Sequence, residues 1–136
     1  MSVGAERDLI ERTPTVLSVS VPVADQDAAL TFYTGVLGCE LRTDVEVWPD
    51  ARLVEVVPRG SNVALVLLPP DSEIPVAIRL GTSDAQHALD KVREAGVTVH
   101  NEELVRREGV PAMLSLTGPD GNGLVYFEET DQSEPR

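Results

Sequence analysis

The sequence predicts an α+β fold built from two tandem βαβββ modules, whose curved mixed sheets form a cleft. Two observations lead to this prediction. Strand-like segments at 15–23 and 76–82 are each followed by an aspartate and an amphipathic helical pattern. The two aspartates, Asp25 and Asp84, are separated by 59 positions, and the same offset aligns apolar residues of the two helices.

The first module begins with TVLSVSVPV, residues 15–23, where apolar and polar side chains alternate as in a strand with one buried face. Asp25 is expected to cap a helix that runs to Gly38, since glycine commonly ends helices. Three further strands are predicted, at Glu40–Val47, Ala51–Val57 and Val63–Leu68.

The second module repeats this order. A strand at 76–82 leads to Asp84, which is expected to cap a helix over 85–96. Three strands then follow, at Val97–Val105, Pro111–Thr117 and Leu124–Glu128. Each sheet buries one face under its own helix, so the other faces are expected to line a ligand cleft.

The predicted domain is residues 15–128, with modules at 15–70 and 75–128. Residues 1–14 are polar and predict a flexible N-terminal arm, while 129–136 predict a solvated acidic tail. The proline-containing segment PPDSEIP, residues 69–75, marks the junction between the modules.

Composition restricts the classes of partner. The chain has 136 residues and a formal net charge of −12, which repels phosphate backbones and anionic membrane surfaces. No apolar run approaches the ~20 residues of a membrane span, and the N-terminus lacks the pattern of a signal peptide. Cys39 is the only cysteine and is expected to be a small buried or edge residue. These features predict a cytoplasmic protein without nucleic-acid or membrane partners.

Three segments resemble the vicinal oxygen chelate superfamily, which includes glyoxalase I, extradiol dioxygenases and bleomycin-resistance proteins. They are VPVADQDAALTFYTGVLGCEL (21–41), LGTSDAQHALDKVREAGVTV (80–99) and GPDGNGLVYFE (118–128). The resemblance extends over nearly the whole chain from Thr15 and implies a homodimer that binds a small organic ligand. It specifies a fold more than an activity, because the superfamily supports many chemistries.

The resemblance also implies where a metal ion would bind. Its ligand positions fall on Ser18, Ala77, Val125 and, in some branches, Val66. One hydroxyl and three alkyl groups cannot supply the nitrogen or oxygen ligands that a divalent ion needs. The expectation is therefore a metal-free branch with no cofactor. His87 is expected to be exposed on its helix, and His100 to have a peripheral structural role.

Strand alternation assigns the remaining cleft residues. The candidate ligand-binding residues are Ser18, Ser20, Trp48, Ala77, Arg79, Met113, Ser115, Val125 and Phe127. Two of them have alternative interpretations. Arg79 either contacts an oxygen of the ligand or pairs with an acid such as Glu55 or Glu128. Trp48 either forms a lid over the cleft or covers a sheet edge.

Three functions remain open on these grounds. The favoured one is a metal-independent protein that sequesters a drug-like or aromatic metabolite. The second is a cofactor-independent lyase, isomerase or oxygenase-like enzyme in which Arg79 stabilises an oxyanion. The third is a metal-dependent glyoxalase or dioxygenase with ligands outside the family pattern.

Overall fold

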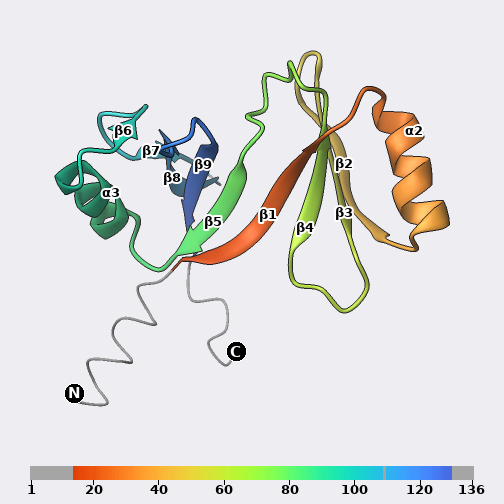
Figure 1. Cartoon of the computed structure of the whole chain (residues 1–136), viewed down its shortest axis with the longest axis horizontal. Helices are drawn as coiled ribbons and strands as arrows, with labels where there is room; N and C mark the ends of the chain where they lie inside the picture. The colour runs from red at the N-terminus through yellow and green to blue at the C-terminus, as the bar shows by residue number, and fades with distance from the viewer. Residues whose placement is uncertain (1–13, 109, 130–136) are drawn as a thin grey trace. The chain divides into compact units, whose positions relative to one another are not determined.

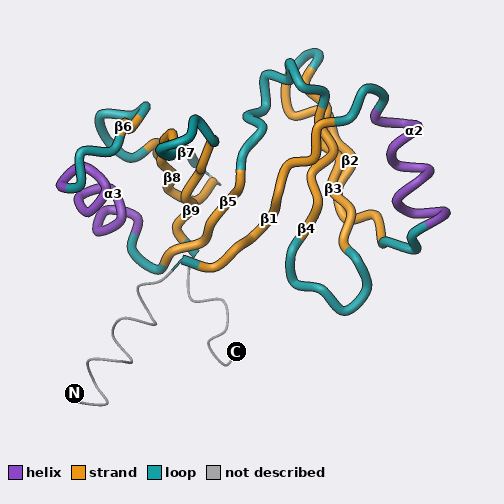
Figure 2. Tube along the Cα trace, in the orientation of Figure 1, coloured by secondary structure: helices purple, strands orange, loops and turns teal. Residues whose placement is uncertain are grey.

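The computed structural model describes residues 14–108 and 110–129 (Figure 1). They divide into two compact units, one of residues 17–78 and the other of residues 79–129 with 14–16. Each unit contains one helical segment and several strands (Figure 2). The α+β class is therefore confirmed. The predicted arm and acidic tail fall almost wholly on 1–13 and 130–136, which lie outside the described residues.

The first unit follows the predicted order of elements. Its sheet has the order β2-β3-β4-β1, with β1 parallel to β4 and the other pairs antiparallel. The elements are β1 (Thr15–Pro22), α2 (Gln26–Thr31), a π-helical turn η1 (Phe32–Val36), β2 (Glu40–Trp48), β3 (Ala51–Val57) and β4 (Ala64–Leu68).

The helical segment of this unit begins and ends at the residues that the sequence indicated. The Asp25 side chain accepts a hydrogen bond from the Ala28 N–H at 3.1 Å, which caps the free amides of the first turn. After η1, Gly38 adopts a φ of 79°, a conformation that favours glycine. The apolar side of the helix packs against buried Val54, Val56 and Leu67. Cys39 is buried in the same cluster, as expected.

The second unit has the strand order β5-β9-β8-β6, and β7 also pairs with β8. Both Asp84 and Glu128 bind amides at the start of its helix. Asp84 accepts from the His87 N–H at 3.0 Å, and Glu128 accepts from the Ala85 N–H at 2.9 Å. The elements are β5 (Ile78–Thr82), α3 (Ala85–Glu94), β6 (Thr98–Val99), β7 (Val105–Arg107), β8 (Val110–Thr117) and β9 (Gly123–Glu128).

The prediction of one strand over Val97–Val105 is wrong. The structure has two short strands, β6 and β7, with a loop between them. In this loop a side chain, and not a backbone carbonyl, accepts the hydrogen bond from β8: Asn101 Oδ1 accepts from the Ser115 N–H at 2.8 Å. Asparagine commonly competes with a strand ladder in this way, and the ladder stops where it does so.

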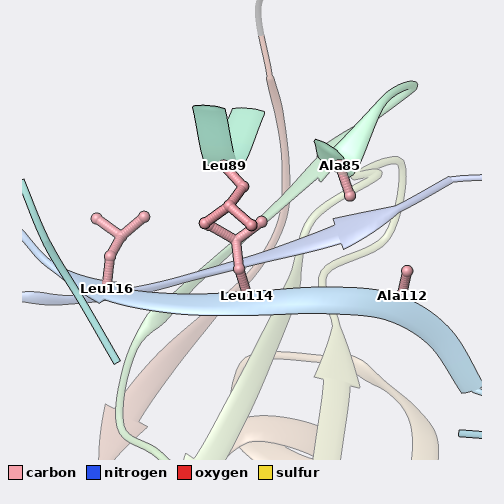
Figure 3. Packing of buried hydrophobic residues seen from close by; sticks show 5 residues of the cluster. All are labelled: Ala85, Leu89, Ala112, Leu114 and Leu116. Carbon is pink, nitrogen blue, oxygen red and sulfur yellow. The ribbon is translucent and has the colours of Figure 1, made fainter. Parts of the chain in front are cut away.

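The core of the second unit lies between α3 and its sheet (Figure 3). Ala112, Leu114 and Leu116 of β8 point toward Leu89 and Ala85 of α3, and all five are buried. Because side chains alternate along a strand, the residues between them point to the opposite face of the sheet. Thus Met113, Ser115 and Thr117 lie on the face away from α3.

None of the helices within residues 14–108 and 110–129 has the length and apolar character required to cross a bilayer.

Candidate small-molecule-binding site

The face of β8 and β9 that points away from α3 carries four of the predicted ligand-binding residues. Met113 pairs with Phe127, and Ser115 pairs with Val125, across the antiparallel ladder. Met113, Ser115 and Phe127 are half-buried, whereas Val125 is only 3% exposed. Arg79 lies half-buried on β5 of the same unit. Methylthioether, hydroxyl and aromatic groups therefore adjoin one another on this face.

His100 also belongs to this face, which the sequence analysis did not predict. Its Nδ1 lies 3.1 Å from Ser115 Oγ, and its Nε2 lies 2.7 Å from Thr117 Oγ1. The His100 backbone N–H also donates to the Ser115 carbonyl at 2.8 Å. Fifteen or more positions separate the partners in the sequence, so no local pattern indicates the contact. His87, in contrast, is exposed on α3 as expected.

In the first unit, two predicted serines lie on one side of β1, beside Ala64 and Val66 of β4. Ser18 is only 2% exposed. The Ser20 hydroxyl accepts from the Ala77 N–H at 3.0 Å and donates to the Pro75 carbonyl at 3.5 Å. These bonds hold residues 75–77 to β1, so this hydroxyl has a structural task in addition to any contact with a ligand.

Trp48 is the last residue of β2, so this strand extends one residue beyond the predicted Glu40–Val47. Its indole N–H donates to Glu73 Oε1 at 2.8 Å, and the residue pairs with Ala51 across the β2–β3 ladder. The hairpin turn begins one residue later and includes Asp50, whose φ is 66°. The side chain is 40% exposed at an outer strand of the sheet.

Both acids considered as partners of Arg79 bind other groups. The Glu55 carboxylate forms an ion pair with Arg42 at 3.1 Å. The Glu128 carboxylate accepts from the first amide of α3. Each acid therefore has a role in the local structure that does not require Arg79.

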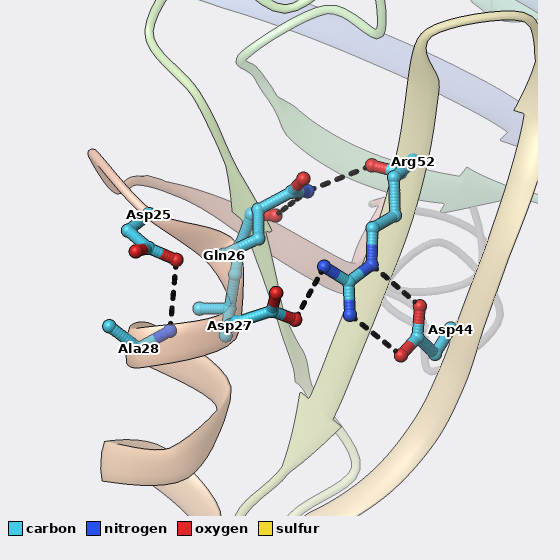
Figure 4. Close-up of polar contacts among 7 residues, drawn as sticks. Asp25, Gln26, Asp27, Ala28, Asp44 and Arg52 are labelled. Carbon is cyan, nitrogen blue, oxygen red and sulfur yellow. Dashed lines mark hydrogen bonds and ion pairs between the residues drawn. The ribbon is translucent and has the colours of Figure 1, made fainter.

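A network of charged and polar side chains lies on the α2 side of the first sheet (Figure 4). Arg52 binds Asp44 through two nitrogens and Asp27 through a third. Gln26 Nε2 donates to the carbonyls of Arg52 and Leu67, both at 2.9 Å. The hydrogen bond from Arg52 lowers the pKa of Asp44, and its positive charge acts in the same direction. This network joins the helix to three strands and is structural.

The four positions at which the resemblance implies metal ligands do not fit a metal ion. Ser18, Val66, Ala77 and Val125 are all buried, at 2%, 0%, 7% and 3% exposure, and together they offer one hydroxyl oxygen. Elsewhere in 14–108 and 110–129, no three His, Cys, Asp or Glu side chains gather in a group able to hold an ion. Divalent ions require three or four nitrogen, oxygen or sulfur ligands.

A model of the Glyoxalase/Bleomycin resistance protein/Dioxygenase superfamily matches residues 15–126, which is most of the chain and includes both units. The chain belongs to this superfamily. The match agrees with the resemblance found in the sequence and extends from β1 into β9.

Three relatives of this superfamily member are 20% to 26% identical to it. The uncharacterised protein YetH of Bacillus subtilis is 26% identical over 116 residues, covering 82% of this chain and 95% of YetH. The hypothetical protein BH1468 of Bacillus halodurans has 20% identity and a TM-score of 0.71, over 91% of this chain and all of that one. Methylmalonyl-CoA epimerase of Mycobacterium tuberculosis has 21% identity and a TM-score of 0.68, over 88% of this chain and 90% of the epimerase. These two structures share the fold.

The second unit also contains an open depression of about 360 Å³ at the end of α3. None of the predicted ligand-binding residues lines it. It is bordered by Arg93, Gly96, Val97, Val99, His100, Asn101 and Glu102. His100 thus lies where the depression meets the loop that precedes β7.

Proposed function

We propose that this superfamily member is a metal-independent binding protein that sequesters a drug-like or aromatic metabolite. The observation that carries the proposal is the chemistry of the four family ligand positions, Ser18, Val66, Ala77 and Val125. Hydrocarbon side chains at three of them leave no basis for coordinating an ion there.

The face of β8 and β9 supports an organic ligand. Ligand sites in proteins are mostly apolar and contain a few placed polar groups. Met113 and Phe127 provide adjacent apolar surface, and Ser115 and Thr117 provide hydroxyls along the same strand. Phe127 can stack on a planar ring, and Met113 adapts to rings of different shape.

A ligand screen with metal-free protein tests the proposal. Planar aromatic metabolites are added, and binding is measured by thermal shift and by the fluorescence of Trp48, the chain's only tryptophan. For each ligand found, Phe127→Ala and Met113→Ala are expected to weaken binding roughly tenfold, which corresponds to about 1.4 kcal/mol. Val36→Ala is the control, because Val36 is 71% exposed in the other unit.

Two results would contradict the proposal. One is near-stoichiometric iron, zinc, nickel or manganese in protein purified without a chelator, together with ligand binding that a chelator abolishes. The other is a set of ligands whose affinities are the same in Phe127→Ala, Met113→Ala and Val36→Ala.

A cofactor-independent enzyme on the same fold is the second candidate, and the position of His100 favours it. An imidazole within hydrogen-bonding distance of Ser115 is a suitable general base on the predicted ligand face. Product analysis separates the two functions: turnover that is lost in His100→Gln or Arg79→Ala, with ligand affinity retained, would establish catalysis.

A further inference from the structure

His100, Ser115 and Thr117 form a hydrogen-bonded cluster on the face of β8 that points away from α3. The imidazole lies between the two hydroxyls, with Nδ1 3.1 Å from Ser115 Oγ and Nε2 2.7 Å from Thr117 Oγ1. The His100 N–H and the Asn101 amide oxygen both bind the backbone of Ser115. Backbone and side-chain bonds therefore fix the ring against β8, while the residue stays exposed to solvent.

The hydrogen-bonding capacity of the cluster depends on the imidazole proton. A neutral imidazole has one N–H donor and one acceptor nitrogen, and each hydroxyl has one donor and two acceptor positions. One hydroxyl then accepts from the ring N–H, and the other donates to the bare nitrogen. The hydroxyl that accepts keeps its own hydrogen. In either tautomer the cluster can thus present one O–H donor to a ligand, at Thr117 or at Ser115.

Protonation of His100 changes this pattern. Both ring nitrogens then donate, so Ser115 and Thr117 both accept and both hydroxyl hydrogens turn outward. The cluster becomes a pair of outward O–H donors beside a positive charge, which is suited to an anionic oxygen. The charged side chains that border the depression together with His100 are Arg93 and Glu102. The Arg93 guanidinium donates to the Asn101 carbonyl at 3.1 Å.

The next residue pair on this face of β8 and β9 is apolar. Met113 precedes Ser115 by two residues on the same face, a spacing of about 7 Å along β8. Phe127 is paired with Met113 on β9. A planar ring resting on these two half-buried side chains would place a substituent over Ser115 and His100.

We propose that His100, Ser115 and Thr117 anchor the carboxylate of a planar aromatic acid, whose ring lies on Met113 and Phe127. This proposal rests on the proposed binding function of the same face and specifies its ligand class. The negative net charge of the chain opposes anions at long range. The anchor therefore has to act through short-range hydrogen bonds and the imidazolium charge.

The test uses 2-naphthoate as probe and 2-naphthamide as its neutral analogue, at constant ionic strength. Affinities are measured calorimetrically at about pH 5.5 and about pH 8, which bracket the range in which imidazoles ordinarily titrate. Wild type is expected to bind naphthoate at least tenfold more tightly at the lower pH, and naphthamide equally at both. Imidazole ¹⁵N resonances assigned to His100 are expected to shift when naphthoate binds.

Substitutions test which residues cause the pH-dependent binding of naphthoate. His100→Gln is expected to abolish both the pH dependence and the preference for naphthoate, while naphthamide binding persists. Ser115→Ala and Thr117→Val are each expected to weaken naphthoate severalfold. His87→Gln is the matched control, since it removes the chain's other histidine from an exposed helix position. Circular dichroism at both pH values verifies that each variant is folded.

The outcomes separate this proposal from the broader one. If His100→Gln and wild type bind naphthoate with the same affinity and pH dependence, the anchor is refuted, but aromatic binding stands. If wild type binds naphthoate and naphthamide with equal affinity at both pH values, the anchor is likewise refuted and aromatic binding stands. If wild type binds neither probe, the anchor is again refuted, and the ligand screen decides the broader function independently.

Discussion

Arg52 and Asp44 form a two-point ion pair across the β2–β3 ladder. Arg52 Nε lies 2.8 Å from one carboxylate oxygen and Nη2 lies 2.9 Å from the other. The remaining terminal nitrogen of Arg52 binds Asp27 at 2.8 Å. A planar guanidinium can make these contacts simultaneously, whereas an ammonium cannot. The pair therefore connects an outer strand and the first turn of α2 to β3.

Asp44→Asn is expected to lower the free energy of unfolding at neutral pH by about 0.2–1 kcal/mol, the range measured for ion pairs near a surface. The pKa of Asp44 is lowered in the folded protein by the hydrogen bond from Arg52. The contribution of the ionised side chain is thus fully present above the ordinary aspartate range and is lost as the pH falls through the lowered pKa.

Urea unfolding across the acid range measures this effect. The difference between wild type and Asp44→Asn is expected to shrink toward about pH 2. Arg52→Lys keeps the charge but loses the two-point geometry, so it is expected to be less stable than wild type at neutral pH. A constant difference between wild type and Asp44→Asn at every pH would show that the carboxylate charge is not responsible.

Asp84→Ala is expected to destabilise the second unit by about 0.5–2 kcal/mol, because it removes the side chain that caps α3. Glu128→Gln is expected to have a smaller effect, since an amide oxygen can still accept from the Ala85 N–H. Chemical denaturation provides the measurement. Glu94→Ala is the control: it removes an acid from the other end of the same helix, where negative charge is not stabilising.

Leu114→Ala is expected to cost about 2–5 kcal/mol, because the side chain is fully buried against α3 and its loss leaves a cavity. Leu37→Ala removes the same atoms from a residue that is 56% exposed and lies outside β2, so a cost within about 0.5 kcal/mol is expected there. Thermal and urea unfolding measure both. Similar costs at the two sites would contradict the core assignment.

A homodimer is predicted from the family resemblance, and β2 offers a suitable surface. It is the outer strand of the first sheet, and its exposed apolar side chains include Leu41, Val45 and Val47. Exposed edge strands of this kind tend to pair with another chain. Sedimentation equilibrium is expected to give about twice the 14.7 kDa mass of one chain. A mass of one chain across the micromolar range would disprove the dimer.

Much of the fold could be predicted because its signals are local. The two capping aspartates, the glycines that follow the helices and the alternation in residues 15–23 each act within a few residues. The orientation of Met113 opposite Leu114 followed from alternation alone. The predicted strand over Val97–Val105 was wrong because β propensity does not reveal that Asn101 bonds to β8.

The candidate site was less predictable than the fold. Strand alternation placed Ser115 and Phe127 on the same face, which the β8–β9 register confirms. The role of His100 depends on hydroxyls that lie 15 and 17 residues further along the chain, and Trp48 binds an acid 25 residues away. Local sequence patterns do not indicate contacts between residues separated by this many positions.

The sequence by itself determined the strand–helix order that opens both units, the aspartates that cap the two helices and the absence of metal-binding side chains at four family positions. These properties follow from residue identity and from contacts between near neighbours. Only the tertiary structure decided that His100 joins Ser115 and Thr117, that Gln26 ties α2 to two strands, and that Trp48 ends a strand. Such contacts form between residues that are distant in sequence, because they arise when the strands align and the helices pack on them.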